Sequence, residues 1–194
     1  MGLSPDMKGF LGEKETLSVL QQLEQRGILF LHDVVVPRTN TVTQIDFMLF
    51  STKVFMCLEV KSWGGEVFIP VANEKWKTVY GHQTIPVHSP ISQNEVHVRA
   101  ANENSLHGIP YENYVVFPKN PVIHNKKPNT GTLSDMVSYV LGLPDKYPEE
   151  FVQKEYEHFK ELTDTYYPAF LEKEFSRQLM SSMKKTDLFG GDYD

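Results

Sequence analysis

Apolar residues recur along the chain with periods that change from one stretch to the next, and these periods predict where helices and strands lie. Over residues 8–27 they recur at every third or fourth position, the spacing of an amphipathic helix, and Gly27 fits its end. Glu13 falls within the apolar stripe, so its side chain is expected to face inward. An inward carboxylate needs a partner, because burying it alone is costly.

Three runs rich in β-branched and aromatic residues follow, separated by polar turns, and predict an antiparallel meander of strands. The runs are residues 28–37, 41–50 and 53–63. Strand side chains alternate between the two faces of a sheet. Ile45, Phe47 and Leu49 are therefore expected to share one face, with Asp46 and Met48 on the opposite one.

The middle of the chain alternates further strand and helix signals, which predicts an α/β domain. Ser89 and Pro90 fit the cap and the first turn of a helix that stops at Gly108. The expected elements, in order, are a hairpin over 66–70 and 75–80, a loop over 81–89, this helix, a strand over 113–118, an irregular connector over 119–131 and a helix over 133–143.

The composition changes after residue 143, where charged helix formers with interspersed aromatics predict a helical extension. Two helical runs are expected, at 146–167 and 168–185, followed by an acidic end. Their aromatic stripes are typical of packing surfaces rather than cofactor sites. The chain thus divides into an α/β domain over residues 8–143 and a helical extension with an acidic tail over residues 144–194.

Length and composition are those of one folded domain with an appendage. Of the 194 residues, 40% are hydrophobic and 23% charged, close to globular averages. No stretch reaches the roughly 20 apolar residues that span a bilayer, and the first residues lack the apolar core of a signal peptide. The single cysteine, Cys57, can form no internal disulfide, which fits a reducing compartment. We therefore expect a cytoplasmic protein without a membrane span.

The formal net charge of −6 is unusual for a protein that holds nucleic acid by electrostatics alone. A carboxylate-rich site contributes negative charge itself, however, and bound divalent cations reverse the local sign. The global charge therefore does not exclude a nuclease. The seven histidines, among them His97, lack the helical pairing or cysteine company of zinc sites and are interpreted as surface or polar-core residues.

The residues that carry chemistry lie in the predicted meander. Asp46 and Glu59 occupy the middle of strands that should be neighbours. Two converging carboxylates repel each other, so such a site holds a divalent cation or keeps one carboxyl protonated. Lys61 follows Glu59 on the same face and would offer its charge to an attacking water or a scissile phosphate. A metal and an adjacent cation are what phosphodiester hydrolysis requires.

A structural alternative is a buried ion pair between Asp46 and Lys61, with Glu59 at the exposed end of its strand, because ion pairs of purely structural role also occur. Glu13 weighs against it, since a third inward acid also needs compensation. Three buried carboxylates facing one lysine without a metal would be costly.

Four segments, in this order, resemble the NERD (nuclease-related) domain family, a branch of the PD-(D/E)xK superfamily. They are KGFLGEKE in the first helix, QIDFMLF in the second strand, EVKSWGG in the third strand and its turn, and SPISQNEVH in the later helix. The resemblance covers residues 8 to about 141. It implies a restriction-endonuclease-like core, with a mixed central β-sheet flanked by helices.

The resemblance also implies roles for six residues. They are Glu13 as the acid of the first helix, Asp46 and Glu59 as metal ligands, the backbone carbonyl of Val60 as a further ligand, Lys61 as the catalytic lysine and Gln93 as a helix residue that supports the site. Glu13 is also expected to contribute to the metal site, and the expected cation is Mg²⁺ or Mn²⁺. The sequence departs from the family at Phe47, where histidine is common, and at Ser62, where asparagine is common; neither supplies the core chemistry.

Together these patterns predict a metal-dependent endonuclease that hydrolyses phosphodiester bonds, in DNA rather than RNA. An alternative is a module on the same fold that binds nucleic acid or a protein partner without cutting. A second alternative is that the helical extension docks a partner while the core only positions it. A homodimer is left open.

Overall fold

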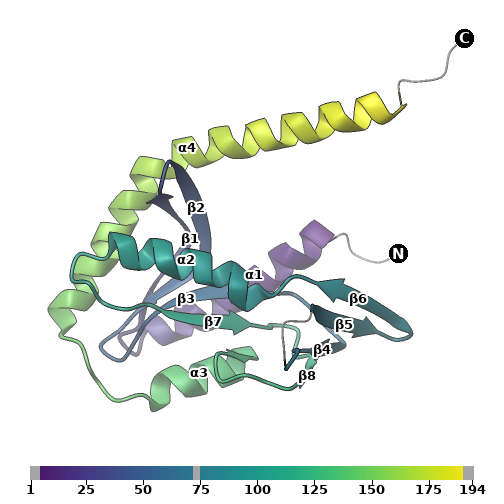
Figure 1. Cartoon of the computed structure of the whole chain (residues 1–194). Helices are drawn as coiled ribbons and strands as arrows, with labels where there is room; N and C mark the ends of the chain where they lie inside the picture. Colours follow the sequence, from purple (N-terminus) through teal and green to yellow (C-terminus); the bar gives the residue numbers. More distant parts are fainter. Residues whose placement is uncertain (1–4, 72–74, 190–194) are drawn as a thin grey trace, which may run out of the picture.

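The part of the chain that the structure describes folds into two β-sheets and four helices (Figure 1). The computed structural model describes residues 5–71 and 75–189. Its helices are α1 (Pro5–Glu24), α2 (Pro90–Asn104), α3 (Leu133–Gly142) and α4 (Glu149–Phe189). Its strands are β1 (Leu29–Arg38), β2 (Thr41–Phe50), β3 (Phe55–Val60), β4 (Glu66–Phe68), β5 (Trp76–Tyr80), β6 (Gln83–Val87), β7 (Glu112–Val116), β8 (Val122–His124) and β9 (Thr130–Gly131).

The central sheet is mixed, with the strand order β1-β2-β3-β7-β9. The first three strands form the predicted antiparallel meander, whereas β7 and β9 run parallel to β3. Parallel neighbours need a crossover connection, and α2 lies within the one between β3 and β7. The predicted α/β fold with a mixed central sheet flanked by helices is confirmed, and it is consistent with a restriction-endonuclease-like core.

Helices cover both faces of this sheet. On one face, Leu20 and Leu23 of α1 pack with α3 and with the β2 residue Phe47. On the other face, α2 and the first part of α4 cover the sheet, and Phe159 of α4 packs against Phe50 of β2. Each face buries its own apolar cluster, which explains why β3 is buried along its whole length.

The alternation of side chains is interrupted where β1 and β2 pass Asp33 and Asp46. Pairing runs from Leu29↔Phe50 to His32↔Phe47 and resumes at Val34↔Ile45, and Asp33 between them has a left-handed φ of 55°. Ile45 consequently packs with Met48 and Phe50 rather than with Phe47 and Leu49. The predicted common face of Ile45, Phe47 and Leu49 is therefore wrong, because regular alternation cannot foresee a change of backbone conformation on the partner strand.

The second sheet has the order β6-β5-β4-β8. Residues 81–89, predicted as a loop, contain the edge strand β6, and residues 119–131, predicted as an irregular connector, contain β8 and β9. Most side chains of β6 are exposed and Pro86 lies within it. An edge strand tolerates proline and buries little apolar surface, so the hydrophobic pattern that reveals central strands is missing.

The predicted C-terminal helical region is one helix, α4, which continues through Pro168, rather than two runs. Its first part belongs to the core, since Val152 and Phe159 are buried among sheet residues. Farther along, α4 leaves the body of the molecule (Figure 1). The end of the predicted acidic tail, residues 190–194, lies outside the described residues. No helix in the described part of the chain has the length and apolar character to cross a membrane.

Candidate active site

Asp46 lies where the β2–β3 ladder ends. The paired residues extend from Phe50↔Phe55 to Phe47↔Leu58 and go no further. Asp46 is the next residue along β2 and has no ladder partner on β3. Its Oδ2 instead accepts a hydrogen bond from the backbone N–H of Val60 at 2.8 Å. Burial raises the pKa of Asp46, whereas the Val60 N–H and the charge of Lys61 act to lower it.

Glu59 is the most deeply buried acid of the site, with 1% of its surface exposed. One of its oxygens, Oε1, lies 2.5 Å from Lys61 Nζ, and the other, Oε2, lies 3.6 Å from Nε2 of His97 on α2. Burial, followed by the charge of Asp46, raises the pKa of Glu59 to about 7, although Lys61 opposes the shift. A carboxyl with this pKa exchanges a proton near neutral pH, and a bound cation would displace that proton.

Glu13 comes from α1, on the opposite side of the sheet from α2. Its side chain is half-buried, and its pKa is raised by burial and then by the charge of Asp46. Lys61 acts in the lowering direction on Glu13, as it does on both other acids. Glu13 therefore lies within electrostatic range of the other two acids, and the ion pair that the structure gives Lys61 is the one with Glu59.

A glycine lets α1 come close to the end of β3. A Cβ added at Gly12 would lie 1.7 Å from Oγ and 3.0 Å from Cβ of Ser62, so a larger residue would require Ser62 to rotate or the helix to shift. Gly12 precedes Glu13, and the close approach it permits brings that carboxylate near the strand end. In the part of the chain that the structure describes, however, no three acid, histidine or cysteine side chains are arranged closely enough to hold a metal ion. Glu13 thus interacts with Asp46 and Glu59 electrostatically. In the described structure the three carboxylates are not close enough to bind one metal ion together.

Gln93, expected to support the site, is exposed on α2, and no described residue forms a hydrogen bond with its side chain. The inward positions belong to Asn94 and His97. Asn94 donates hydrogen bonds to the backbone carbonyls of Cys57 and Tyr114 and so connects α2 to β3 and β7. The structure brings Glu13, Asp46, Glu59 and Lys61 together but not Gln93.

His97, which the sequence pattern marked only as a surface or polar-core histidine, is buried and lies at the site. Its Nδ1 lies 3.1 Å from the Thr43 hydroxyl, while its Nε2 faces Glu59. Burial, followed by the charges of Lys61 and Arg38, lowers its pKa to about 4, so the ring is neutral at pH 7. The helical spacing of Asn94 and His97, three residues apart on a helix that must cover a sheet, is the signal that could have identified them.

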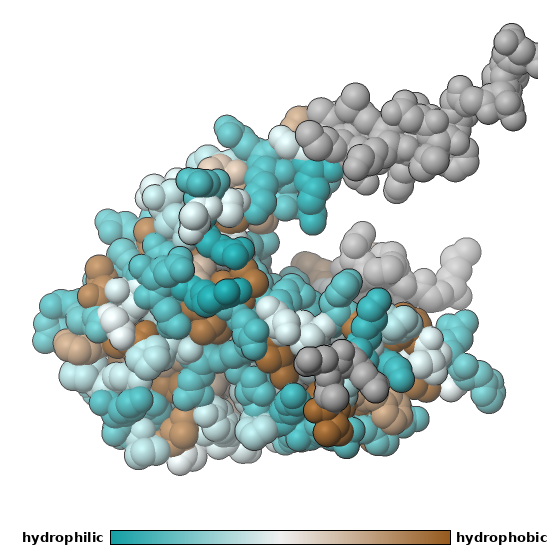
Figure 2. All heavy atoms as spheres, viewed as in Figure 1, coloured by the Kyte–Doolittle hydropathy of each residue, from teal (hydrophilic) through white to brown (hydrophobic). Residues whose placement is uncertain are grey.

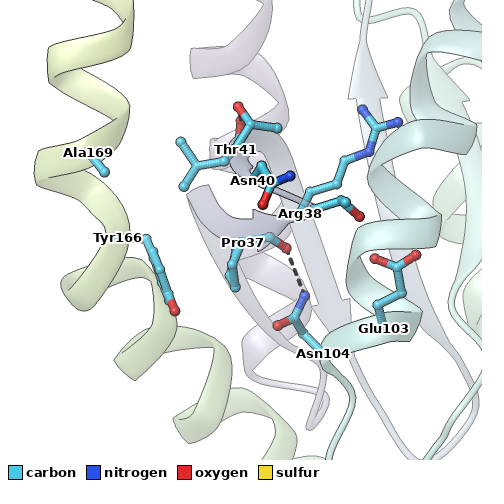
Figure 3. A pocket seen from close by; sticks show the side chains of 10 residues that line it. Pro37, Arg38, Asn40, Thr41, Glu103, Asn104, Tyr166 and Ala169 are labelled. Carbon is cyan, nitrogen blue, oxygen red and sulfur yellow. Dashed lines mark hydrogen bonds between the residues drawn. The ribbon is translucent and has the colours of Figure 1, made fainter.

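A cavity of about 480 Å³ lies away from these acids, between the β1–β2 hairpin, the end of α2 and α4 (Figure 3). Its lining includes Pro37, Asn104 and Tyr166 but none of the four charged residues of the site. On the face of the molecule shown in Figure 2, hydrophilic side chains predominate and hydrophobic ones are scattered among them. The acidic cluster is therefore distinct from this hollow.

Among the comparisons with known proteins, a match to a family model covers just over half of the chain. The model of the nuclease-related domain matches residues 8–118, from α1 to just beyond β7. Glu13, Asp46, Glu59 and Lys61 all lie within the match. No curated protein and no solved structure matches the chain.

Proposed function

The chain belongs to the nuclease-related domain (NERD) family, whose model covers more than half of it, and we propose that it is a metal-dependent nuclease that hydrolyses phosphodiester bonds in DNA. The proposed cation is Mg²⁺, for which Mn²⁺ can substitute. The observation that carries this proposal is the placement of the buried Glu59 2.5 Å from Lys61, beside Asp46, whose charge raises the pKa of both Glu59 and Glu13.

The donor set fits a hard divalent cation, which prefers oxygen ligands. Asp46 and Glu59 repel each other, and Lys61 compensates only part of their combined charge. A cation between them would offset both the burial and the repulsion by Asp46 that raise the pKa of Glu59. Asp46, Glu59 and the backbone carbonyl of Val60 are the proposed ligands, and Glu13 adds negative charge from the side of α1.

When bound, the cation would lower the pKa of a water molecule and stabilise the anionic transition state. The residues of the chain have separate tasks. The Val60 N–H holds Asp46 in place, and the neutral His97 ring faces Glu59 on the side away from Lys61. Lys61 lies beside Glu59, where its charge can stabilise negative charge on a phosphate.

A cleavage assay tests the proposal. The full chain would be incubated with supercoiled, linear and single-stranded DNA and with RNA, with Mg²⁺ and with chelator. We expect cleavage of DNA that needs the metal and is largely lost in Lys61→Met, prepared in the same way. Binding of DNA without metal-dependent cutting would favour the alternative, a module that only holds its partner.

A further inference from the structure

Arg38 ends β1 on the face of the sheet that α2 covers. It pairs with Thr41, and two residues earlier Val36 pairs with Thr43. Directly opposite residues of antiparallel strands share a face. Thr43 reaches His97 on α2, so Arg38 lies on the same face, one strand repeat farther toward the hairpin tip.

The hairpin that carries Arg38 is held from two sides. Asn104, at the end of α2, donates a hydrogen bond to the carbonyl of Pro37 at 3.0 Å (Figure 3). Lys173 of α4 donates one to the carbonyl of Val42 at 2.7 Å. Pro37 and Val42 pair with each other, so the two helices hold the hairpin at the level just before Arg38. A cation on an anchored backbone needs less ordering when it binds an anion.

Within the described part of the chain, the guanidinium of Arg38 has no carboxylate partner. Among the side chains that the structure describes, no acid lies within 4.0 Å of it, although Arg38 is half-buried. Glu103 borders the same hollow, but the Arg38 side chain extends away from it along α2 (Figure 3). Arg177, by contrast, pairs with Glu174. A partly buried guanidinium left unpaired is available for an anion from outside.

Arg38 also lies near the acidic cluster. Thr43, one strand repeat from Arg38, lies 3.1 Å from Nδ1 of His97, and Nε2 of His97 lies 3.6 Å from Oε2 of Glu59. His97 thus connects the face that carries Arg38 to the acidic cluster, where Lys61 lies 2.5 Å from the other oxygen of Glu59. Lys61 and Arg38 therefore give a phosphodiester backbone two positively charged contacts. Such local contacts matter because the formal net charge of the chain is −6.

We propose that Arg38 binds a backbone phosphate that flanks the phosphate cleaved at the acidic cluster. This inference rests on the proposed nuclease function. The planar guanidinium can bind two phosphate oxygens at once, which fixes the direction of the strand as well as attracting it.

Binding of fluorescently labelled duplex DNA, measured by anisotropy over a series of salt concentrations, tests this role. The full chain with Lys61→Met serves as the parent, so that cutting does not interfere. Arg38→Gln should weaken binding about tenfold at low salt and reduce the salt slope by about 0.9, the value for one phosphate contact. Arg38→Lys should keep the salt slope but lose part of the affinity for DNA, because lysine keeps the positive charge but cannot bind two phosphate oxygens at once.

Arg26→Gln is the matched control, since it removes the same charge from an exposed arginine just beyond α1. It lies 13 residues after Glu13, which corresponds to about 20 Å along a helix. If Arg38→Gln shows the affinity and slope of Arg26→Gln, the role of Arg38 is refuted. If Arg38→Gln fails to fold, the DNA affinity of Arg38→Lys tests the proposal instead. An affinity equal to that of the parent would refute the bidentate contact.

Cleavage by the chain with Lys61 intact separates the two proposals. If this chain cuts DNA and Arg38→Gln leaves KM unchanged, only the Arg38 role is wrong. If it binds DNA through Arg38 but does not cut with any metal, the nuclease function is wrong and the phosphate contact stands. If it neither binds nor cuts, both proposals are overturned.

Discussion

The carboxylate of Asp46 accepts a hydrogen bond of 2.8 Å from the backbone N–H of Val60, just beyond the last paired residues of β2 and β3. The side chain replaces a missing ladder hydrogen bond and so satisfies a backbone group that would otherwise lack a partner. It also fixes Asp46 relative to the peptide that follows Glu59. The separation of the two acids is thus set by the backbone and not only by side-chain rotamers.

Removing this carboxylate should abolish cation binding and cleavage together. Asp46→Ala deletes a proposed ligand and leaves the Val60 N–H without its acceptor, which we expect to lower stability by about 1–3 kcal/mol. Asp46→Asn keeps an acceptor for that N–H and should lose metal affinity with little loss of stability. Titration calorimetry with Mn²⁺ and thermal unfolding would measure both effects. Unchanged Mn²⁺ affinity in both variants would contradict the ligand assignment.

Lys61→Met should separate catalysis from metal binding. Methionine retains most of the side-chain stem but removes the charge that lies 2.5 Å from Glu59 Oε1. We expect Mn²⁺ and DNA still to bind, while single-turnover cleavage slows roughly 10²- to 10³-fold, the usual effect of losing one electrostatic stabiliser. Cleavage at the parental rate would show that Lys61 has a structural role only.

Glu59 should make the stability of the metal-free chain depend on pH. Its pKa is raised from 4.5 to about 7 in the folded chain, so the folded state holds a proton that the unfolded state has released. Its stabilising contribution is complete below pH 4.5 and is lost as the pH rises through about 7. The lowered pKa of His97 acts in the opposite sense between about 4 and 6.5, so a difference measurement is needed.

That difference is the free energy of unfolding of the parent minus that of Glu59→Gln, measured by denaturant titration in chelator. Because His97 is present in both proteins, its contribution largely cancels. We expect the difference to decrease between pH 4.5 and about 7. A difference that stays level or increases over this interval would rule out a raised pKa at Glu59.

Glu155 should anchor α4 without taking part in the chemistry. It is fully buried and accepts hydrogen bonds from the Ser105 hydroxyl, from the backbone N–H of His107 and from the Tyr111 hydroxyl. Glu155→Ala leaves these donors without an acceptor, so we expect a loss of about 3 kcal/mol. Glu157→Ala, on the exposed side of the same helix, should change stability by less than about 0.5 kcal/mol. Similar effects of the two substitutions would disprove the anchor.

Truncation should show that α4 has two parts. A chain ending at residue 145 loses the buried Val152 and Phe159, each worth about 1.5–3 kcal/mol, and should unfold at a clearly lower temperature. A chain ending at residue 177 retains them and should unfold like the full chain. Thermal unfolding followed by circular dichroism would compare all three. Equal stability of the shortest chain would mean that the first part of α4 is not needed by the core.

The sequence by itself determined the elements whose signals are local. The helical spacing before Gly27, the three apolar runs of the meander and the cap at Ser89 each depend on near neighbours, so α1, β1 to β3 and α2 could be predicted. The order of the family motifs then indicated Glu13, Asp46, Glu59 and Lys61. The polar edge strand β6 left no such local signal.

Only the tertiary structure decided how those residues meet, because the distance between residues remote in sequence depends on strand register and helix packing. The left-handed Asp33 changed the face of Ile45 on the neighbouring strand, which no pattern within β2 records. Packing of α2 placed His97 rather than Gln93 at the acids. Both α2 and α4 bury their apolar sides on one face of the sheet and form hydrogen bonds to the β1–β2 hairpin. This packing places Arg38, which has no acidic partner among the described side chains, on the face that also carries His97.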